Sequence, residues 1–193
     1  MLGKLWHKER QRIQTILESV VEVLQKYNRR DLDAEAALER IIDSAIESYS
    51  GVQEVNRVSQ LESLKAEVVT AQHGINPYTL EKVTLGRRQM KGTVAFRVLQ
   101  SLQSMLSQEM TAIDSKLQDA EDMVQQILLS ALQSGVVTLK ELEDADSQNA
   151  VEAIWKVVEK DGTLLVAKKK VILSVGVYDG IILCDKVIAG LRS

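Results

Sequence analysis

The chain has 193 residues, of which 45% are hydrophobic and 26% are charged, and it carries a formal net charge of −3 at pH 7. This composition is typical of a soluble globular protein and excludes intrinsic disorder, and the length allows a substantial core without a disulfide or a metal ion. A single proline and an aromatic content of 4% favour long helices over a β-sandwich or a β-barrel.

The N-terminal part of the chain predicts three helices. Apolar side chains recur at steps of three and four from residue 2 to residue 27, which is the spacing of a helix with one buried face. After a break at residues 28–31, Asp31 or Asp33 can cap a second helix, which Gly51 ends. A third helix over residues 52–73 ends before Gly74, because glycine readily adopts the left-handed conformation that follows a helix.

The next connection predicts less regular structure. Pro77 comes directly after Asn76, which favours a short helix to about Val83, because proline fits the first helical position. Residues 85–92 contain two glycines and three cations, and they predict a loop or a loosely helical connector.

The clearest pattern is one long amphipathic helix over about residues 93–134. The chain contains neither glycine nor proline between Gly92 and Gly135, and its apolar residues alternate at steps of three and four, as in a coiled coil. The predicted interaction seam consists of Leu99, Leu102, Leu106, Met110, Ile113, Leu117, Val124 and Ile127, with Ala120 and Ala131 in the same pattern. Such a seam must be buried, either by other helices of the chain or by a second chain.

The C-terminal part predicts further helices. Thr138 and Glu141 match a capping box, and Ser147 or Asp146 can begin the next helix. Residues 162–193 allow two structures, which are a β-hairpin turning at residues 179–180 and a pair of helices in which Asp179 caps the second. We favour the helices, because a lone hairpin is marginal without a sheet to join.

Together these patterns predict an all-α protein. We expect an elongated helical bundle over residues 1–161, with one long coiled-coil-like helix. An apolar C-terminal segment over residues 162–193, helical or a small β-hairpin, packs on this bundle or joins it in a single domain.

Residue types for catalysis or metal binding are scarce. Only His7 and His73 are present, neither has the spacing from a glutamate that di-iron bundles use, and the single cysteine, Cys184, excludes an internal disulfide and a cysteine-based zinc site. A nucleophile elbow, a Walker A loop and a dinucleotide-binding turn are also absent from the sequence. We therefore expect a non-enzymatic protein with no catalytic residue, metal site or cofactor, in which Cys184 is a buried structural thiol.

Two segments have the composition of a binding surface. The segment from residue 82 to residue 97 contains no acid and five cations: Lys82, Arg87, Arg88, Lys91 and Arg97. These cations could bind phosphate or another anion, although a solvated connector that faces the acidic segments is the simpler interpretation.

At the N-terminus Leu2, Leu5 and Trp6 lie among cations, as in an interfacial membrane anchor. No apolar run is long and uncharged enough for a transmembrane helix or a secretory signal.

We accordingly expect a cytoplasmic helical interaction protein, which serves as a scaffold, an adaptor or a subunit of an assembly. Its partner would be another protein or a second copy of the chain, bound through coiled-coil-like helix packing. The first alternative is a membrane-active protein that engages lipid through its N-terminal amphipathic helix or its C-terminal apolar segment. The second is nucleic-acid binding through the basic segment over residues 82–97, which the acidic net charge disfavours.

Overall fold

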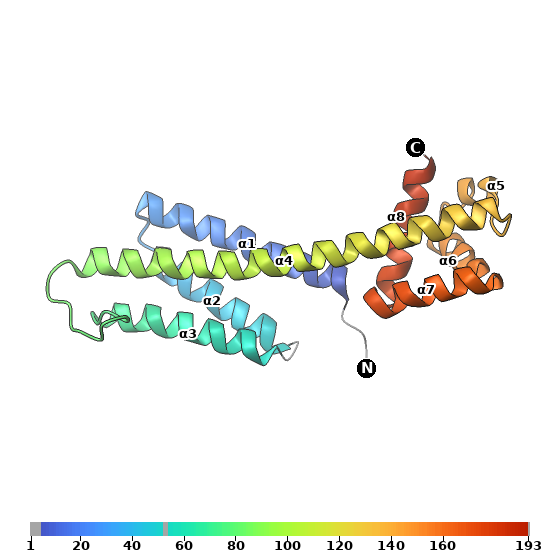
Figure 1. Ribbon diagram of the computed structural model, residues 1–193. Helices are drawn as coiled ribbons and strands as arrows, with labels where there is room; N and C mark the ends of the chain where they lie inside the picture. The colour runs from blue at the N-terminus through green and yellow to red at the C-terminus, as the bar shows by residue number, and fades with distance from the viewer. Residues whose placement is uncertain (1–4, 52–53, 193) are drawn as a thin grey trace. The chain divides into compact units, whose positions relative to one another are not determined.

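The computed structural model describes residues 5–51 and 54–192, and the protein is all-helical over these residues (Figure 1). Its eight α-helices are α1 (Trp6–Arg29), α2 (Ala34–Gly51), α3 (Val55–Gln72), α4 (Arg87–Gln133), α5 (Leu139–Glu143), α6 (Gln148–Val157), α7 (Gly162–Val175) and α8 (Val177–Arg192). A 3-10 turn, η1 (Val158–Lys160), follows α6. The predicted all-α class is confirmed for the described residues.

Contacts within the chain define two compact units. Residues 12–110 form the first, which we call the four-helix unit, and residues 1–11 together with residues 111–193 form the second, which we call the C-terminal unit. Both boundaries fall inside helices, because α1 and α4 contribute residues to each unit. Within the C-terminal unit α7 packs against η1 and α8 packs against α6, so the last two helices contact the segment that precedes them.

In the four-helix unit α1, α2, α3 and the first half of α4 run alongside one another (Figure 1). Only four residues separate α1 from α2, and short links of this kind make successive helices antiparallel neighbours. The helices turn their apolar faces to one another and bury Ile13, Val20, Leu38, Ile42, Leu61, Leu99, Leu102 and Leu106.

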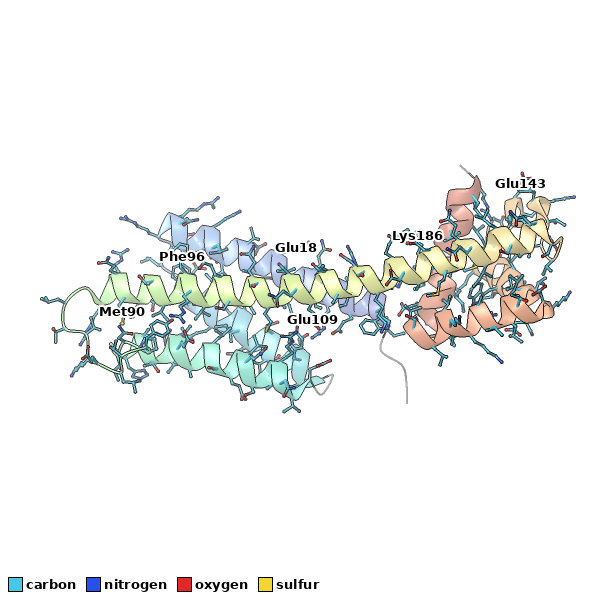
Figure 2. The ribbon with its side chains drawn as sticks, in the orientation of Figure 1. Glu18, Met90, Phe96, Glu109, Glu143 and Lys186 are labelled. Carbon is cyan, nitrogen blue, oxygen red and sulfur yellow. The ribbon has the colours of Figure 1, made fainter. Side chains whose placement is uncertain are left out.

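A polar cluster inside the four-helix unit joins all four of its helices. The fully buried Tyr49 of α2 donates a hydrogen bond from its hydroxyl to Oε2 of Glu109 on α4, at 2.6 Å. Glu109 is labelled in Figure 2. Arg57 of α3 places its Nε 3.9 Å from the same carboxylate, and the guanidinium of Arg12 on α1 lies 4.3 Å from the centre of the Tyr49 ring. These directional contacts fix the axial position of each helix, which apolar packing alone specifies less well.

A second buried polar contact fixes the start of α1 within the C-terminal unit. Asp179, in the first turn of α8, is completely buried. Its Oδ2 accepts a hydrogen bond from the backbone N–H of Trp6 at 2.6 Å, and its Oδ1 lies 2.7 Å from Nδ1 of His7. The carboxylate therefore caps α1 from a distant part of the sequence, since the first N–H groups of a helix have no partner within it. Asp179 is predicted from the sequence to cap its own helix, α8, but its carboxylate caps α1 instead.

The C-terminal segment is helical, and the β-hairpin alternative is wrong. Gly176 ends α7 with a φ of 91°, a left-handed conformation that favours glycine, and α8 begins at the next residue. The helix caps predicted at Thr138 and Ser147 are confirmed, because both side chains accept hydrogen bonds from backbone N–H groups of α5 and α6. Asp161, in turn, caps α7 by accepting from two backbone N–H groups.

The connection between α3 and α4 differs from the prediction in two ways. The segment predicted as a short helix from Pro77 to Val83 is a loop, in which the Asn76 side chain accepts from the N–H of Tyr78 and an isolated bridge pairs Ile75 with Lys82. Residues 87–92, predicted as part of a connector, are instead the first turns of α4. Arginine, glutamine, methionine and lysine are strong helix formers, and they outweigh the cost of about 1 kcal/mol for the single Gly92.

The predicted seam of α4 lies in the interior of the two units. Every seam residue except Met110, which is half-buried, exposes 7% or less of its surface, and Leu99, Leu102, Leu106 and Val124 expose none. The chain's own helices therefore cover this seam. Contact between two chains through the same residues stays a prediction, and it would require the helices to separate.

We predict that Tyr49→Phe lowers the free energy of unfolding by about 1–3 kcal/mol, because the buried carboxylate of Glu109 loses its hydroxyl donor. Urea denaturation of the full chain measures this change. Tyr78→Phe is the matched control, since the Tyr78 hydroxyl also donates to a carboxylate, that of Glu67, but the residue is 43% exposed. Equal stability of the two variants would contradict the role given to Tyr49.

We predict that Asp179→Ala raises hydrogen–deuterium exchange at the first amides of α1 and costs about 1–2 kcal/mol of stability, because these amides lose their cap. Asp185→Ala is the control, since Asp185 is an exposed carboxylate on the same helix. If both variants leave the exchange at residues 6–9 unchanged, Asp179 does not cap α1.

Candidate interaction site

The candidate site is a cleft of about 640 Å³ at one end of the four-helix unit. Its walls come from the end of α1, the turn between α1 and α2, the end of α3 and the start of α4. The residues that line it combine cations, aromatic rings and an exposed leucine, and they include Tyr27, Arg30, Leu32, Arg87, Arg88, Lys91 and Phe96. We call this the α1–α4 cleft.

The turn between α1 and α2 supplies one rim of the cleft. Arg30 follows the last residue of α1 and has a φ of 60°, which is uncommon for a residue with a side chain. The chain then presents Leu32, which is fully exposed at 104% of its reference area. A leucine with this exposure makes no packing contribution to its own fold, so the rim holds an apolar group available to a partner.

The start of α4 supplies the opposite rim. Arg87 is held in place, because its Nε donates to the carbonyl of Val83 at 2.8 Å and its guanidinium packs over Gly74. Gly74 has a φ of 76°, which favours glycine, and a Cβ at position 74 would lie 3.0 Å from that Nε, so a larger residue would also displace the Arg87 side chain.

Aromatic residues form the apolar wall of the cleft. Tyr27 of α1 and Phe96 of α4 pack with their ring centroids 6.2 Å apart and their ring planes tilted by 56°. Phe96 is labelled in Figure 2. Phe96 remains 38% exposed. Burial, followed by the nearby carboxylates of Glu35 and Glu39, raises the pKa of Tyr27 to about 12, so its hydroxyl stays protonated at neutral pH.

The α1–α4 cleft is lined by four cations and two acids, Asp31 and Glu35, so its net charge is positive. Lys91 is neutralised by Glu35, which its Nζ approaches to 3.2 Å. Arg30 and Arg88 are exposed, and neither side chain has a hydrogen-bond or ion-pair partner among the described residues. Two guanidinium groups therefore remain available, and guanidinium binds carboxylate and phosphate through paired hydrogen bonds.

The structure brings together three of the five cations predicted to bind anions. Arg87, Arg88 and Lys91 line the cleft, whereas Lys82 and Arg97 do not. The guanidinium of Arg97 lies 4.1 Å from the centre of the Tyr78 ring, in the loop before α4. Sequence reasoning missed Arg30 and Leu32, although the exposed leucine in a turn between two charged residues was a visible signal.

The predicted membrane-contact residues have structural partners where they are described. The Trp6 ring lies 4.2 Å from Nζ of Lys116, and its backbone N–H binds Asp179. Leu5 is 36% exposed, and Leu2 lies outside the described residues. Among the described residues, no helix combines the length and the apolar character needed to cross a bilayer.

Residues considered for chemistry occupy structural positions. Cys184 is completely buried, and this burial raises the pKa of its thiol to about 12, so little thiolate exists at neutral pH. His73 lies at the C-terminal end of α3, where its Nδ1 is 2.8 Å from the carbonyl of Val69.

Comparison with models of known protein families gave no match for this chain. Searches of curated proteins and of solved structures also found no similar protein.

Proposed function

We propose that this chain is a non-enzymatic helical interaction protein, a scaffold, an adaptor or a subunit of an assembly, that binds an acidic partner segment in the α1–α4 cleft. The observation that carries the proposal is the rim, where Leu32 is fully exposed and the cations Arg30 and Arg88 have no partner among the described residues. The segment we propose as ligand has carboxylates along one side and apolar side chains along the other.

Two interactions would stabilise the complex, which are burial of apolar surface and attraction between opposite charges. Burial of a fully exposed leucine contributes roughly 1.5–3 kcal/mol, and the exposed edge of Phe96 extends the same apolar area. Arginine and tyrosine are enriched among the residues that dominate binding energy at protein interfaces, and both are present in the cleft. An acidic segment with an apolar face fits these groups, because it can place carboxylates on the arginines while its apolar residues cover Leu32 and Phe96.

The framework around the cleft favours recognition with little rearrangement. Arg87 is fixed by Val83 and Gly74, and the pair of Tyr27 and Phe96 ties α1 to α4. Because these groups are held in place before a partner arrives, less conformational entropy is lost on binding. The site therefore supports binding by a rigid surface, which suits a scaffold or an adaptor.

We predict that the full chain binds a fluorescein-labelled acidic amphipathic peptide, built from glutamate and leucine at helical spacing, more tightly than a peptide in which lysine replaces every glutamate. Fluorescence anisotropy at low and high salt measures both affinities. The double variant Arg30→Glu and Arg88→Glu should weaken binding of the acidic peptide at least about tenfold, because two attractions become repulsions. Leu32→Ser should weaken it without changing the salt dependence.

The matched control is the double variant Arg40→Glu and Lys82→Glu, which changes the charge by the same amount at exposed positions that do not line the cleft. We expect it to retain most of the affinity. An equal loss in both double variants would show that the peptide responds to overall charge, and it would overturn the proposed site. Tighter binding of single-stranded DNA than of the acidic peptide would overturn the proposed partner class.

A further inference from the structure

Helix α7, in the C-terminal unit, is apolar on two opposite faces. One face is buried in the core of the unit through Leu164, Val171 and Val175. The other face carries Val166, which is 56% exposed, and Leu173, which is 85% exposed. At 3.6 residues per turn these two residues lie only about 20° apart around the helix, and both point nearly opposite to the buried face. The described chain leaves this apolar stripe uncovered.

Lysines border the stripe on both sides. By the same helical geometry Lys169 lies about 60° to one side of Val166 and Lys170 about 40° to the other. Both lysines are exposed, neither has a hydrogen-bond or ion-pair partner within the described part of the chain, and α7 contains no acidic residue.

The neighbouring carboxylate, Glu159 of η1, forms its ion pair with Lys168, whose Nζ lies 2.8 Å from its Oε1. Lys168 lowers the pKa of Glu159 first by this hydrogen bond, and the charges of Lys168, Lys156 and Lys169 add to the effect. Lys156 and Lys169 therefore lie near the same carboxylate, which places a cation of α6 close to the lysines of α7.

We propose that the outer face of α7, formed by Val166, Lys169, Lys170 and Leu173, binds the surface of an anionic lipid bilayer, with α7 lying in the plane of the headgroups. An anionic surface complements this face, because its only charged residues are lysines. The apolar side chains reach the boundary between headgroups and acyl chains, while the lysines extend their ammonium groups toward anionic headgroups on either side.

The chemistry of the face favours lipid over a protein partner. Lysine is a hydrated, flexible point charge that suits the diffuse attraction of a fluid anionic surface, at about 1 kcal/mol per residue, whereas arginine suits directional binding of a fixed carboxylate. The α1–α4 cleft has three arginines, and the outer face of α7 has none. The stripe is also one side chain wide, which is small beside the roughly 800 Å² per partner of a stable protein interface.

We predict that the full chain sediments with vesicles of phosphatidylcholine containing phosphatidylglycerol and does not sediment with pure phosphatidylcholine. The variant Lys169→Glu with Lys170→Glu, and the variant Val166→Ser with Leu173→Ser, should each lower the partition coefficient at least about tenfold. Both pairs of sites are exposed, so circular dichroism and thermal melting should match those of the unmodified chain. The control Leu32→Ser with Leu85→Ser removes two exposed leucines of the four-helix unit and should leave vesicle binding unchanged.

A second readout locates the contact. A fluorophore sensitive to polarity is attached at Leu173→Cys or, as a control, at Leu139→Cys on α5, where the leucine is 67% exposed. The native thiol of Cys184 is fully buried, so the label attaches to the introduced residue. We expect a blue shift on anionic vesicles at position 173 and none at position 139.

Three results would overturn this proposal. The first is that the unmodified chain binds neutral and anionic vesicles equally or binds neither. The second is that the Leu32 and Leu85 variant loses binding while the α7 variants keep it. The third is that the label at position 173 responds to the acidic peptide and not to vesicles, which would assign the face to a protein. The α1–α4 cleft is tested separately, by the effect of Arg30→Glu with Arg88→Glu on the affinity for the acidic peptide.

Discussion

Burial of the apolar stripe of α4 is the constraint on which both units depend, because one uninterrupted helix supplies the centre of each core. In the four-helix unit the stripe includes Leu99 and Leu106, and contacts from α1, α2 and α3 reach α4 around it. In the C-terminal unit Val124 belongs to the same stripe, and Lys186 of α8 reaches Glu121 of α4 at 2.6 Å (Figure 2). The apolar area removed from water here supplies most of the driving force for folding.

Polar contacts then select one arrangement among the many that apolar packing allows. Inside the four-helix unit the hydroxyl of Tyr49 donates a hydrogen bond to the carboxylate of Glu109. Inside the C-terminal unit the carboxylate of Asp179 accepts a hydrogen bond from the first backbone N–H of α1. A shift of either helix by one turn would leave a buried polar group without a partner, at a cost of about 1–3 kcal/mol each. These contacts therefore specify the register of helices whose apolar faces would tolerate several.

The two surfaces proposed for binding differ in a way that follows from how each is built. The cleft is lined by parts of four helices and a turn, and contacts to Val83 and Gly74 hold Arg87 in a fixed direction. The outer face of α7 is a single helix surface that carries lysines. A fixed concave site favours a partner of one shape, whereas an exposed charged helix face can bind a fluid lipid surface.

The sequence by itself determined the helices, because periodicity and caps act between residues three or four positions apart. It identified the stripe of α4, the caps at Thr138 and Ser147, and three cations of the cleft. The sequence did not predict where α4 begins, because the local preferences of residues 87–92 oppose one another. The strong helix formers of this segment outweigh Gly92, and α4 begins at Arg87. Only the tertiary structure decided which residues meet across the sequence, since it places Arg30 and Arg88 in one cleft and sets Asp179 against the first turn of α1. Such pairings depend on the packing of whole helices, which no short stretch of sequence encodes.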